Sequence, residues 1–288
     1  MSLIRPSRIA LAVVLVAAPP AALTAQELDP HLYPKFELDA SGSLLLFSTV
    51  VRADPTAGPG TGTEVSFEND LGSARDNFEP RGALRWRPGR RHELEVGFLR
   101  AIRSGDRTLD RTINFRDTSF TVGATVASSL RTSQAFLNYR YAFRVRDNSQ
   151  IGAALGVGVI FLKASLNATA AAGGGPTIGD SATSKLNGPV ASLGLYGRFR
   201  AGETWYLEAD GRGVYIAISN FTGTVVEGGL AARKFLSNSF GLEFGWNIGF
   251  YKVTLDRPAS GSGFLGSGFT GSVKYTVNAF RAGIVFQP

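Results

Sequence analysis

Apolar and polar residues alternate along most of this chain with a period of two, the pattern of β-strands that have one apolar face. Near the C-terminus, Phe280, Ile284 and Phe286 fall on one face of such a strand, and Arg281 and Gly283 fall on the other. The segments that follow this pattern are residues 35–52, 78–87, 93–98, 137–145, 151–159, 192–200, 205–212, 226–233, 240–249 and 273–288. The pattern predicts an all-β fold of about ten strands, within a range of roughly eight to twelve.

The connections between these segments alternate in length. Tight turns are predicted near residues 89, 148, 202 and 238, where Gly, Asn, Asp and Ser residues interrupt the alternation. Most other connections are long, with loops expected at 53–77, 100–129, 165–185 and 255–268, and a short loop expected near Asn220. Short turns at one end and long loops at the other are typical of a transmembrane antiparallel up-and-down β-barrel, and an even strand count returns both chain ends to the turn end.

The polar faces of the segments carry arginines and glutamates that would point into the barrel. If the strands pair symmetrically about the tight turns, the opposed pairs are Arg85–Glu95, Arg87–Glu93, Arg198–Glu208 and Arg233–Glu243. The predicted charge network of the lumen consists of Arg81, Arg85, Glu93, Glu95, Arg140, Arg144, Arg198, Glu208, Asp210, Arg212, Glu227, Arg233, Glu243 and Arg281. Barrels of about eight to ten strands are narrow enough for side chains to fill. The network therefore predicts a closed interior, with a narrow polar conduit as the alternative.

The start of the chain predicts export. Arg5 and Arg8 precede an apolar segment at 9–18, and the stretch ends in small residues at Ala25, which is the pattern of a cleaved secretory signal. Residues 1–25 are therefore expected to be the signal peptide. Residues 26–288 are expected to form one barrel domain.

In its alternating strands, its turn asymmetry and its closing strand with Phe286, the chain resembles the small OmpA/OmpX-like barrels of Gram-negative outer membranes. The aromatic residue is usually the last one in those proteins, whereas Gln287 and Pro288 follow it here. The resemblance implies an integral protein of the cell outer membrane, in contact with lipid and lipopolysaccharide and recognised by barrel-assembly machinery through its C-terminal strand. Outward aromatic residues at the turn end would form the membrane-interface girdle, namely Trp86, Tyr139, Tyr141, Phe143, Trp205, Phe240 and Phe286.

Composition narrows the possible partners. The chain has no cysteine, which excludes disulfides and cysteine chemistry. Its net charge of +7 is spread along the sequence without a Lys/Arg block, so nucleic acid is not an expected partner, whereas lipopolysaccharide phosphates are. After the signal, the apolar run at 157–162 has only strand length, which argues against a membrane-spanning helix.

The motifs that could carry chemistry have simpler structural explanations. Residues 261–271 contain two overlapping G-x-G-x-x-G patterns, but a strand rather than a helix is expected to follow, so no cofactor is predicted. His31 and His92 fall in the lead-in and beside a turn, where solvated residues are expected, and they form neither a catalytic nor a metal site. Residues 68–70 are expected to form an Asx-type turn, and the alternating Asp and Arg residues of 103–117 a solvated hairpin.

Three functional hypotheses follow. The first is a non-enzymatic outer-membrane barrel with a filled lumen and a structural or surface-interaction role through its loops. The second is a narrow pore or small-solute transporter. The third is an outer-membrane hydrolase or lipid A modifying enzyme. It is the weakest hypothesis, because such enzymes place a histidine at the loop end, whereas His31 and His92 are expected in the lead-in and beside a tight turn.

Overall fold

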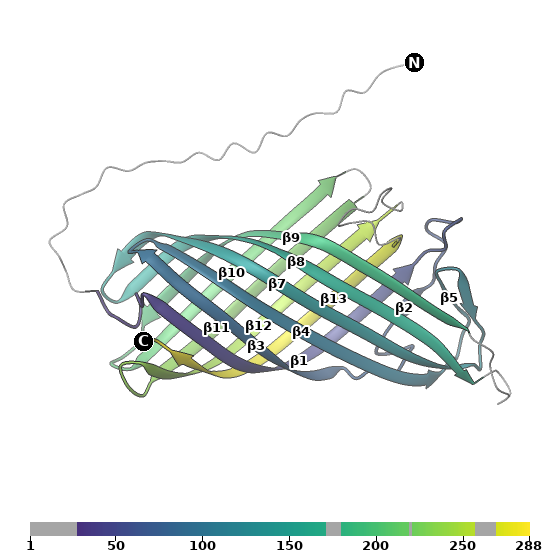
Figure 1. Ribbon diagram of the computed structural model, residues 1–288, viewed down its shortest axis with the longest axis horizontal. Helices are drawn as coiled ribbons and strands as arrows, with labels where there is room; N and C mark the ends of the chain where they lie inside the picture. Colours follow the sequence, from purple (N-terminus) through teal and green to yellow (C-terminus); the bar gives the residue numbers. More distant parts are fainter. Residues whose placement is uncertain (1–27, 171–179, 219–220, 257–268) are drawn as a thin grey trace, which may run out of the picture.

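The computed structural model describes residues 28–170, 180–218, 221–256 and 269–288. The long strands in these ranges are β1 (Phe36–Ala53), β3 (Asp76–Gly89), β4 (His92–Thr108), β7 (Thr125–Arg146), β8 (Ser149–Ala170), β9 (Ser181–Arg200), β10 (Trp205–Ile218), β11 (Phe221–Phe235), β12 (Phe240–Leu255) and β13 (Gly271–Phe286). Each pairs antiparallel with its neighbour in the chain, and β13 returns to pair with β1 from Leu38↔Phe286 to Ala53↔Gly271. Within the described residues, these strands form the closed ten-stranded barrel of Figure 1. The predicted fold class and strand number are confirmed.

Across the middle of the barrel, the side chains that point outward from the strands are apolar, and they form an apolar belt around the wall. Examples from five strands are Leu44, Val96, Leu155, Leu195 and Phe244, all of which are exposed. The short turns and the C-terminus lie at one end, here called the turn end, and the long connections lie at the other, the loop end (Figure 1). No helix among the described residues has the length and apolar character to span a membrane.

Two predicted loops are partly strand. Residues 100–129 and 165–185 were expected to be loop, but β4 continues to Thr108, β7 starts at Thr125, β8 runs to Ala170 and β9 starts at Ser181. The alternation continues there with reversed polarity: inward residues such as Leu130 and Leu166 are buried, while outward Lys163 is exposed. This reversal identifies strands that extend past the apolar belt. The predicted signal at 1–25 and the glycine motif at 261–268 lie outside the described residues.

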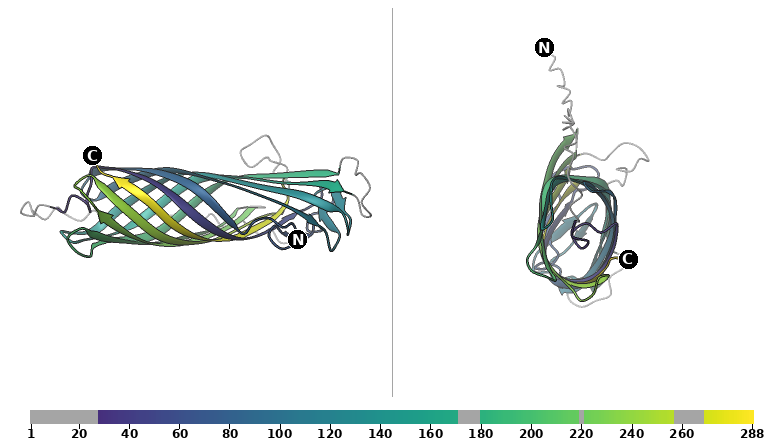
Figure 2. Two further views of the ribbon diagram at one scale, coloured as in Figure 1. Left: turned by 90° about the horizontal axis from the view of Figure 1, so that it is seen from below. Right: turned by 90° about the vertical axis from the view of Figure 1, so that its left-hand side faces the viewer.

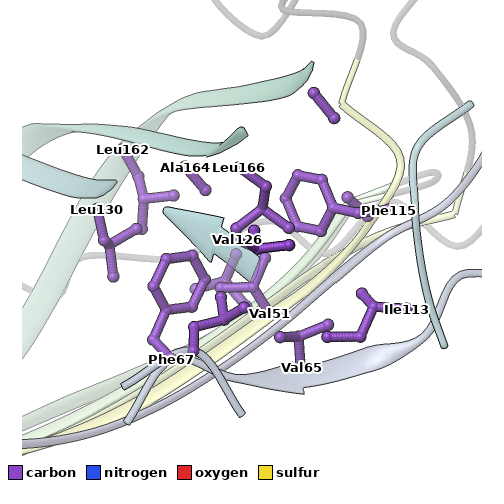
Figure 3. Packing of buried hydrophobic residues seen from close by; sticks show 14 of the residues in the cluster. Val51, Val65, Phe67, Ile113, Phe115, Val126, Leu130, Leu162, Ala164 and Leu166 are labelled. Carbon is purple, nitrogen blue, oxygen red and sulfur yellow. The ribbon is translucent and has the colours of Figure 1, made fainter. Parts of the chain in front are cut away.

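An apolar cluster closes the loop end. It includes Val51, Val126, Leu130, Leu162 and Leu166 of the barrel wall, and Figure 3 shows how they gather. Three short strands contribute further members, namely β2 (Glu64–Ser66), which pairs with β1, and the hairpin of β5 (Ile113–Phe115) and β6 (Thr118–Phe120). We call these three strands with the cluster the loop-end cap.

Polar contacts hold the loop-end cap together. Thr63 N donates to Asn114 O at 2.9 Å, which links the segment before β2 to β5. The backbone N–H and the hydroxyl of Thr56 donate to Asp117, and these bonds lower the pKa of Asp117 below its ordinary value. Residues 68–70 lie in a turn, but its type differs from the expected Asx-type turn: Asp70 N donates to Ser66 O at 2.9 Å, and Ser66 N donates back to Asp70 Oδ2 at 2.8 Å.

The hairpin expected at 103–117 is not fully solvated. Arg103 is 5% exposed and forms an ion pair with buried Glu68, and its Nη2 donates to Thr49 Oγ1 at 2.6 Å. The reason is that Arg103 lies on the inward face of the extended part of β4. Arg107 and Arg111, by contrast, lie at the exposed surface as expected.

The turn end is closed by the lead-in to β1. Leu32 is 1% exposed and packs with Tyr206, Phe235 and Val285. The end-on view of Figure 2 shows this start of the described chain, in purple, within the outline of the barrel. His31 was expected to be a solvated turn residue, but it stacks on Phe235 at 3.8 Å, and its Nδ1 is 2.9 Å from Gln287 Oε1. The residue after the terminal aromatic thus anchors the lead-in.

Candidate functional site: a luminal ion-pair layer

The cross-strand pairs predicted from turn symmetry are present in the lumen. The register places Arg85 opposite Glu95, Arg198 opposite Glu208 and Arg233 opposite Glu243. The Nε of each arginine meets an Oε2 of its partner, at 2.6, 3.1 and 2.7 Å respectively. Arg87 and Glu93 also form an ion pair, although a register shift lies between Trp86 and Gly89.

These pairs are joined to one another across the lumen. Glu208 of β10 accepts from Arg140 of β7 at 2.8 Å and lies 3.2 Å from Arg233 of β11. Glu93 of β4 accepts two bonds from Arg198 of β9, at 2.8 and 2.9 Å. Strands that are not neighbours in the wall are therefore connected through the middle. We call this set of charges the ion-pair layer.

A looser set of charges lies beside the ion-pair layer. Arg212 Nε is 3.0 Å from Glu227 Oε2 and 3.7 Å from Asp210 Oδ2. Arg281 Nε is 2.7 Å from Glu243 Oε1. Arg81 lies 3.9 Å from Glu95, so its closest ion pair among the described residues is weak.

One predicted member does not reach the lumen. Arg144 is exposed, because the register between β7 and β8 shifts between Ala142 and Arg144. Such a bulge leaves one extra residue on one strand and reverses the faces that follow it. Strict alternation therefore placed Arg144 on the wrong side of the wall.

Several members of the network were not predicted. Glu37 is buried and forms ion pairs with Arg85 and, at 3.3 Å, with Arg233. Gln287 Nε2 donates to Glu37 at 2.8 Å, and Asn138 Nδ2 donates to Glu95 at 3.0 Å. Glu37 was detectable, since it falls on the polar face of the first segment, and the register pairs it with Arg85. The contacts made by the amides depend on the barrel cross-section, which the sequence pattern does not give.

The ion-pair layer spans the lumen with buried and paired side chains. A buried charge is stable only when it is paired and hydrogen-bonded, and each carboxylate here faces more than one guanidinium. Above the layer, toward the loop-end cap, lies a cavity of about 150 Å³. It is bordered by polar groups such as Ser192 and Asn247, and by aromatic rings such as Phe47, Phe136 and Tyr275.

The two histidines of the chain both lie at the turn end, where His31 contacts Gln287 and His92 Nδ1 is 2.7 Å from the hydroxyl of Tyr139. Among the described residues, no group of three or more His, Cys, Asp or Glu side chains is arranged to hold a metal ion.

Solved structures resemble this architecture. The outer membrane protease OmpT from Escherichia coli superposes with a TM-score of 0.53 at 12% sequence identity, over 88% of this chain and 96% of that one. The chain has the fold of outer-membrane β-barrels. Ail, the attachment invasion locus protein of Yersinia pestis, matches with a TM-score of 0.37 at 9% identity, over 88% of this chain and 99% of that one. No protein-family model matches the sequence, and no curated protein sequence matches it.

Proposed function

We propose that this chain is an integral outer-membrane barrel with a closed lumen, and that it acts through its loop end rather than as a conduit. The observation that carries this proposal is the ion-pair layer, which connects β4, β7, β9, β10 and β11 across the interior. The lead-in around Leu32 and the loop-end cap lie on either side of it. Ions would have to break buried ion pairs to pass, which makes steady conduction costly.

The partner that the loop end favours is a phosphate-bearing lipid leaflet. Arg131, Lys163 and Lys185 are exposed on neighbouring strands, and the register pairs Arg131 with Lys163 and Lys163 with Lys185. Like charges directly opposite one another are destabilising unless anions neutralise them. This basic row lies just beyond the apolar belt, where we propose that it contacts the phosphates of a lipopolysaccharide leaflet. The C-terminal strand, with Phe280 and Phe286 exposed on its outer face, is the part that assembly machinery would recognise.

We propose a non-enzymatic role because both histidines lie at the end opposite the loop-end cap. OmpT is a protease, but its likeness to this chain is one of fold at 12% identity. Incubation of the folded protein with unstructured peptides should therefore give no cleavage products above a heat-unfolded control.

Planar-bilayer recording tests the closed lumen. The wild-type protein should insert without steady single-channel conductance. A parallel sample should show the heat-dependent gel migration of a folded barrel, so that silence is not mistaken for failed folding. Uniform, long-lived current steps from such protein would replace the proposal with the narrow-pore alternative.

A further inference from the structure

The barrel wall is split on one side. Pairing between β9 and β10 extends from Arg200↔Tyr206 to Leu193↔Gly213 and stops there, although β9 extends back to Ser181 and β10 extends on to Ile218. On its other side β9 remains paired with β8 over this whole stretch. Figure 1 shows the two strands separating toward the loop end. We call this opening the β9–β10 split.

The sequence favours an open edge here. Pro189 lies in the unpaired part of β9, and proline has no N–H to donate to a neighbouring strand, so it is confined to sheet edges. Outward Leu193 and Leu195 lie at the closed side of the split, and outward Lys185 lies toward its open end. The split therefore begins in the apolar belt and ends at the basic row. At membrane depth, unpaired backbone is tolerated where it lines a cavity or is covered.

The split leads from the outer wall toward the luminal cavity. The pocket between the strands is lined by apolar residues, among them Leu186 and Val190 of β9, Val214 and Ile216 of β10, and Val225 of β11. Val190 also lines the luminal cavity of about 150 Å³. Apolar residues therefore line both the split and the adjoining side of the luminal cavity.

The luminal cavity selects a particular polar group. Three carboxylates border it, from Glu79, Asp210 and Glu227, against the two guanidiniums of Arg81 and Arg212. Glu79 is 5% exposed, and its Oε1 is buried without a hydrogen-bond partner among the described residues. A buried acceptor without a partner is costly, so the site favours a ligand group that donates a hydrogen bond and carries no negative charge. A cavity of this volume holds a group about the size of benzene.

We propose that the luminal cavity and the β9–β10 split together bind a single-chain, uncharged amphiphile of the long-chain alcohol type. Its hydroxyl donates to Glu79, and its hydrocarbon chain lies between β9 and β10 and reaches the membrane. This inference goes beyond the proposed surface role, because a closed barrel with no luminal ligand would satisfy that role equally well.

Fluorescence quenching in vesicles tests the site. The chain has no cysteine, so Tyr215→Cys can carry a single bimane label on the outer rim of the split, and Leu195→Cys can carry the same label where β9 and β10 are paired. Position 195 is the matched control for position 215, because the two side chains are similarly exposed, Leu195 at 62% and Tyr215 at 68%. The probe is undecanol with a terminal bromine, added to phosphatidylcholine vesicles.

The expected result is saturable quenching at position 215, reversed by unlabelled undecanol, and only linear quenching at position 195. Glu79→Ala should raise the concentration needed for half-saturation roughly tenfold, the effect of losing one hydrogen bond. Val190→Trp should fill the space where the split meets the luminal cavity, and it should therefore abolish saturable quenching at position 215. Variants are used only if they show heat-dependent gel migration.

Two results would overturn the proposal. Linear quenching at both positions would show that the label senses only brominated alcohol dissolved in the bilayer. Saturable quenching that is equally strong for the brominated carboxylic acid, and unchanged by Glu79→Ala, would contradict the assigned polar group. Neither result depends on whether the barrel conducts.

Discussion

At the scale of single residues, the buried carboxylates of the ion-pair layer are shared rather than paired one to one. Glu95 is 0% exposed, and it contacts Arg85 at 2.6 Å and Arg140 at 3.3 Å. The single negative charge of this carboxylate is shared by two buried guanidiniums. Removing it leaves Arg85 with Glu37 and Arg140 with Glu208, but it takes one negative charge out of a buried layer in which unbalanced charges are costly.

Glu95→Gln should therefore lower the free energy of unfolding by about 3–5 kcal/mol, the usual cost of removing one partner from a buried ion pair. Glu64→Gln is the matched control, because Glu64 pairs with Lys274 at 3.0 Å while both side chains are largely exposed. The control should change stability by less than about 1 kcal/mol. Urea unfolding in vesicles measures both, and equal effects of the two changes would contradict a buried charge layer.

At the scale of strands, the alternation of apolar and polar residues was enough to give the number of strands, the turn end and the opposed charge pairs. It was enough because period two and short turns fix the register of neighbouring strands. It failed at Arg144, where a bulge changes the face without a signal in the local pattern. It also gave no strands in the part of the wall near the loop end, because outward apolar residues mark the strands of the apolar belt, whereas Leu130 and Leu166 face inward there. Contacts across the lumen, such as Glu93 with Arg198, depend on barrel closure and could not be derived from neighbouring strands.

Close packing between β9 and β10 gives a prediction at this scale. A Cβ added to Gly194 would lie 2.1 Å from the backbone oxygen of Gly211 and 2.5 Å from Cβ of Arg212, and backbone cannot easily move away. Gly194→Ala should thus destabilise the barrel by about 1–3 kcal/mol. Gly211→Ala, where a Cβ meets nothing within 4 Å, is the control and should have little effect. The comparison is made by urea unfolding, and a neutral Gly194→Ala would mean that the two strands are farther apart than described.

We expect the short strands of the loop-end cap to open separately from the barrel wall. Phe115 of β5 is fully buried in it, so Phe115→Ala should cost about 3–5 kcal/mol within the cap through the cavity it leaves. Faster amide hydrogen exchange is expected in β5 and β6 with unchanged heat-dependent migration of the barrel. Val122→Ala is the control, because Val122 is exposed on the same connection. Global loss of the barrel with Phe115→Ala would show that the cap and the wall fold as one unit.

At the scale of the whole molecule, the interior is layered along the barrel axis. The lead-in with Leu32 closes the turn end, the ion-pair layer follows, then the luminal cavity, and the apolar loop-end cap closes the other end. The outer surface is layered as well, with an apolar belt and then the basic row of Arg131, Lys163 and Lys185. The order of these layers, inside and outside, predicts one orientation in the membrane, with the basic row toward the lipopolysaccharide side.

This orientation can be measured in intact cells, because the absence of cysteine allows single labelling sites. Ala57→Cys lies in the exposed connection at the loop end, and Asn148→Cys lies in the exposed turn between β7 and β8. A membrane-impermeant maleimide should label position 57 in whole cells and position 148 only after the outer membrane is permeabilised. The reverse order would place the basic row on the periplasmic side, where lipopolysaccharide phosphates are absent. The like charges of Arg131, Lys163 and Lys185 would then lack the anions that we propose hold them side by side.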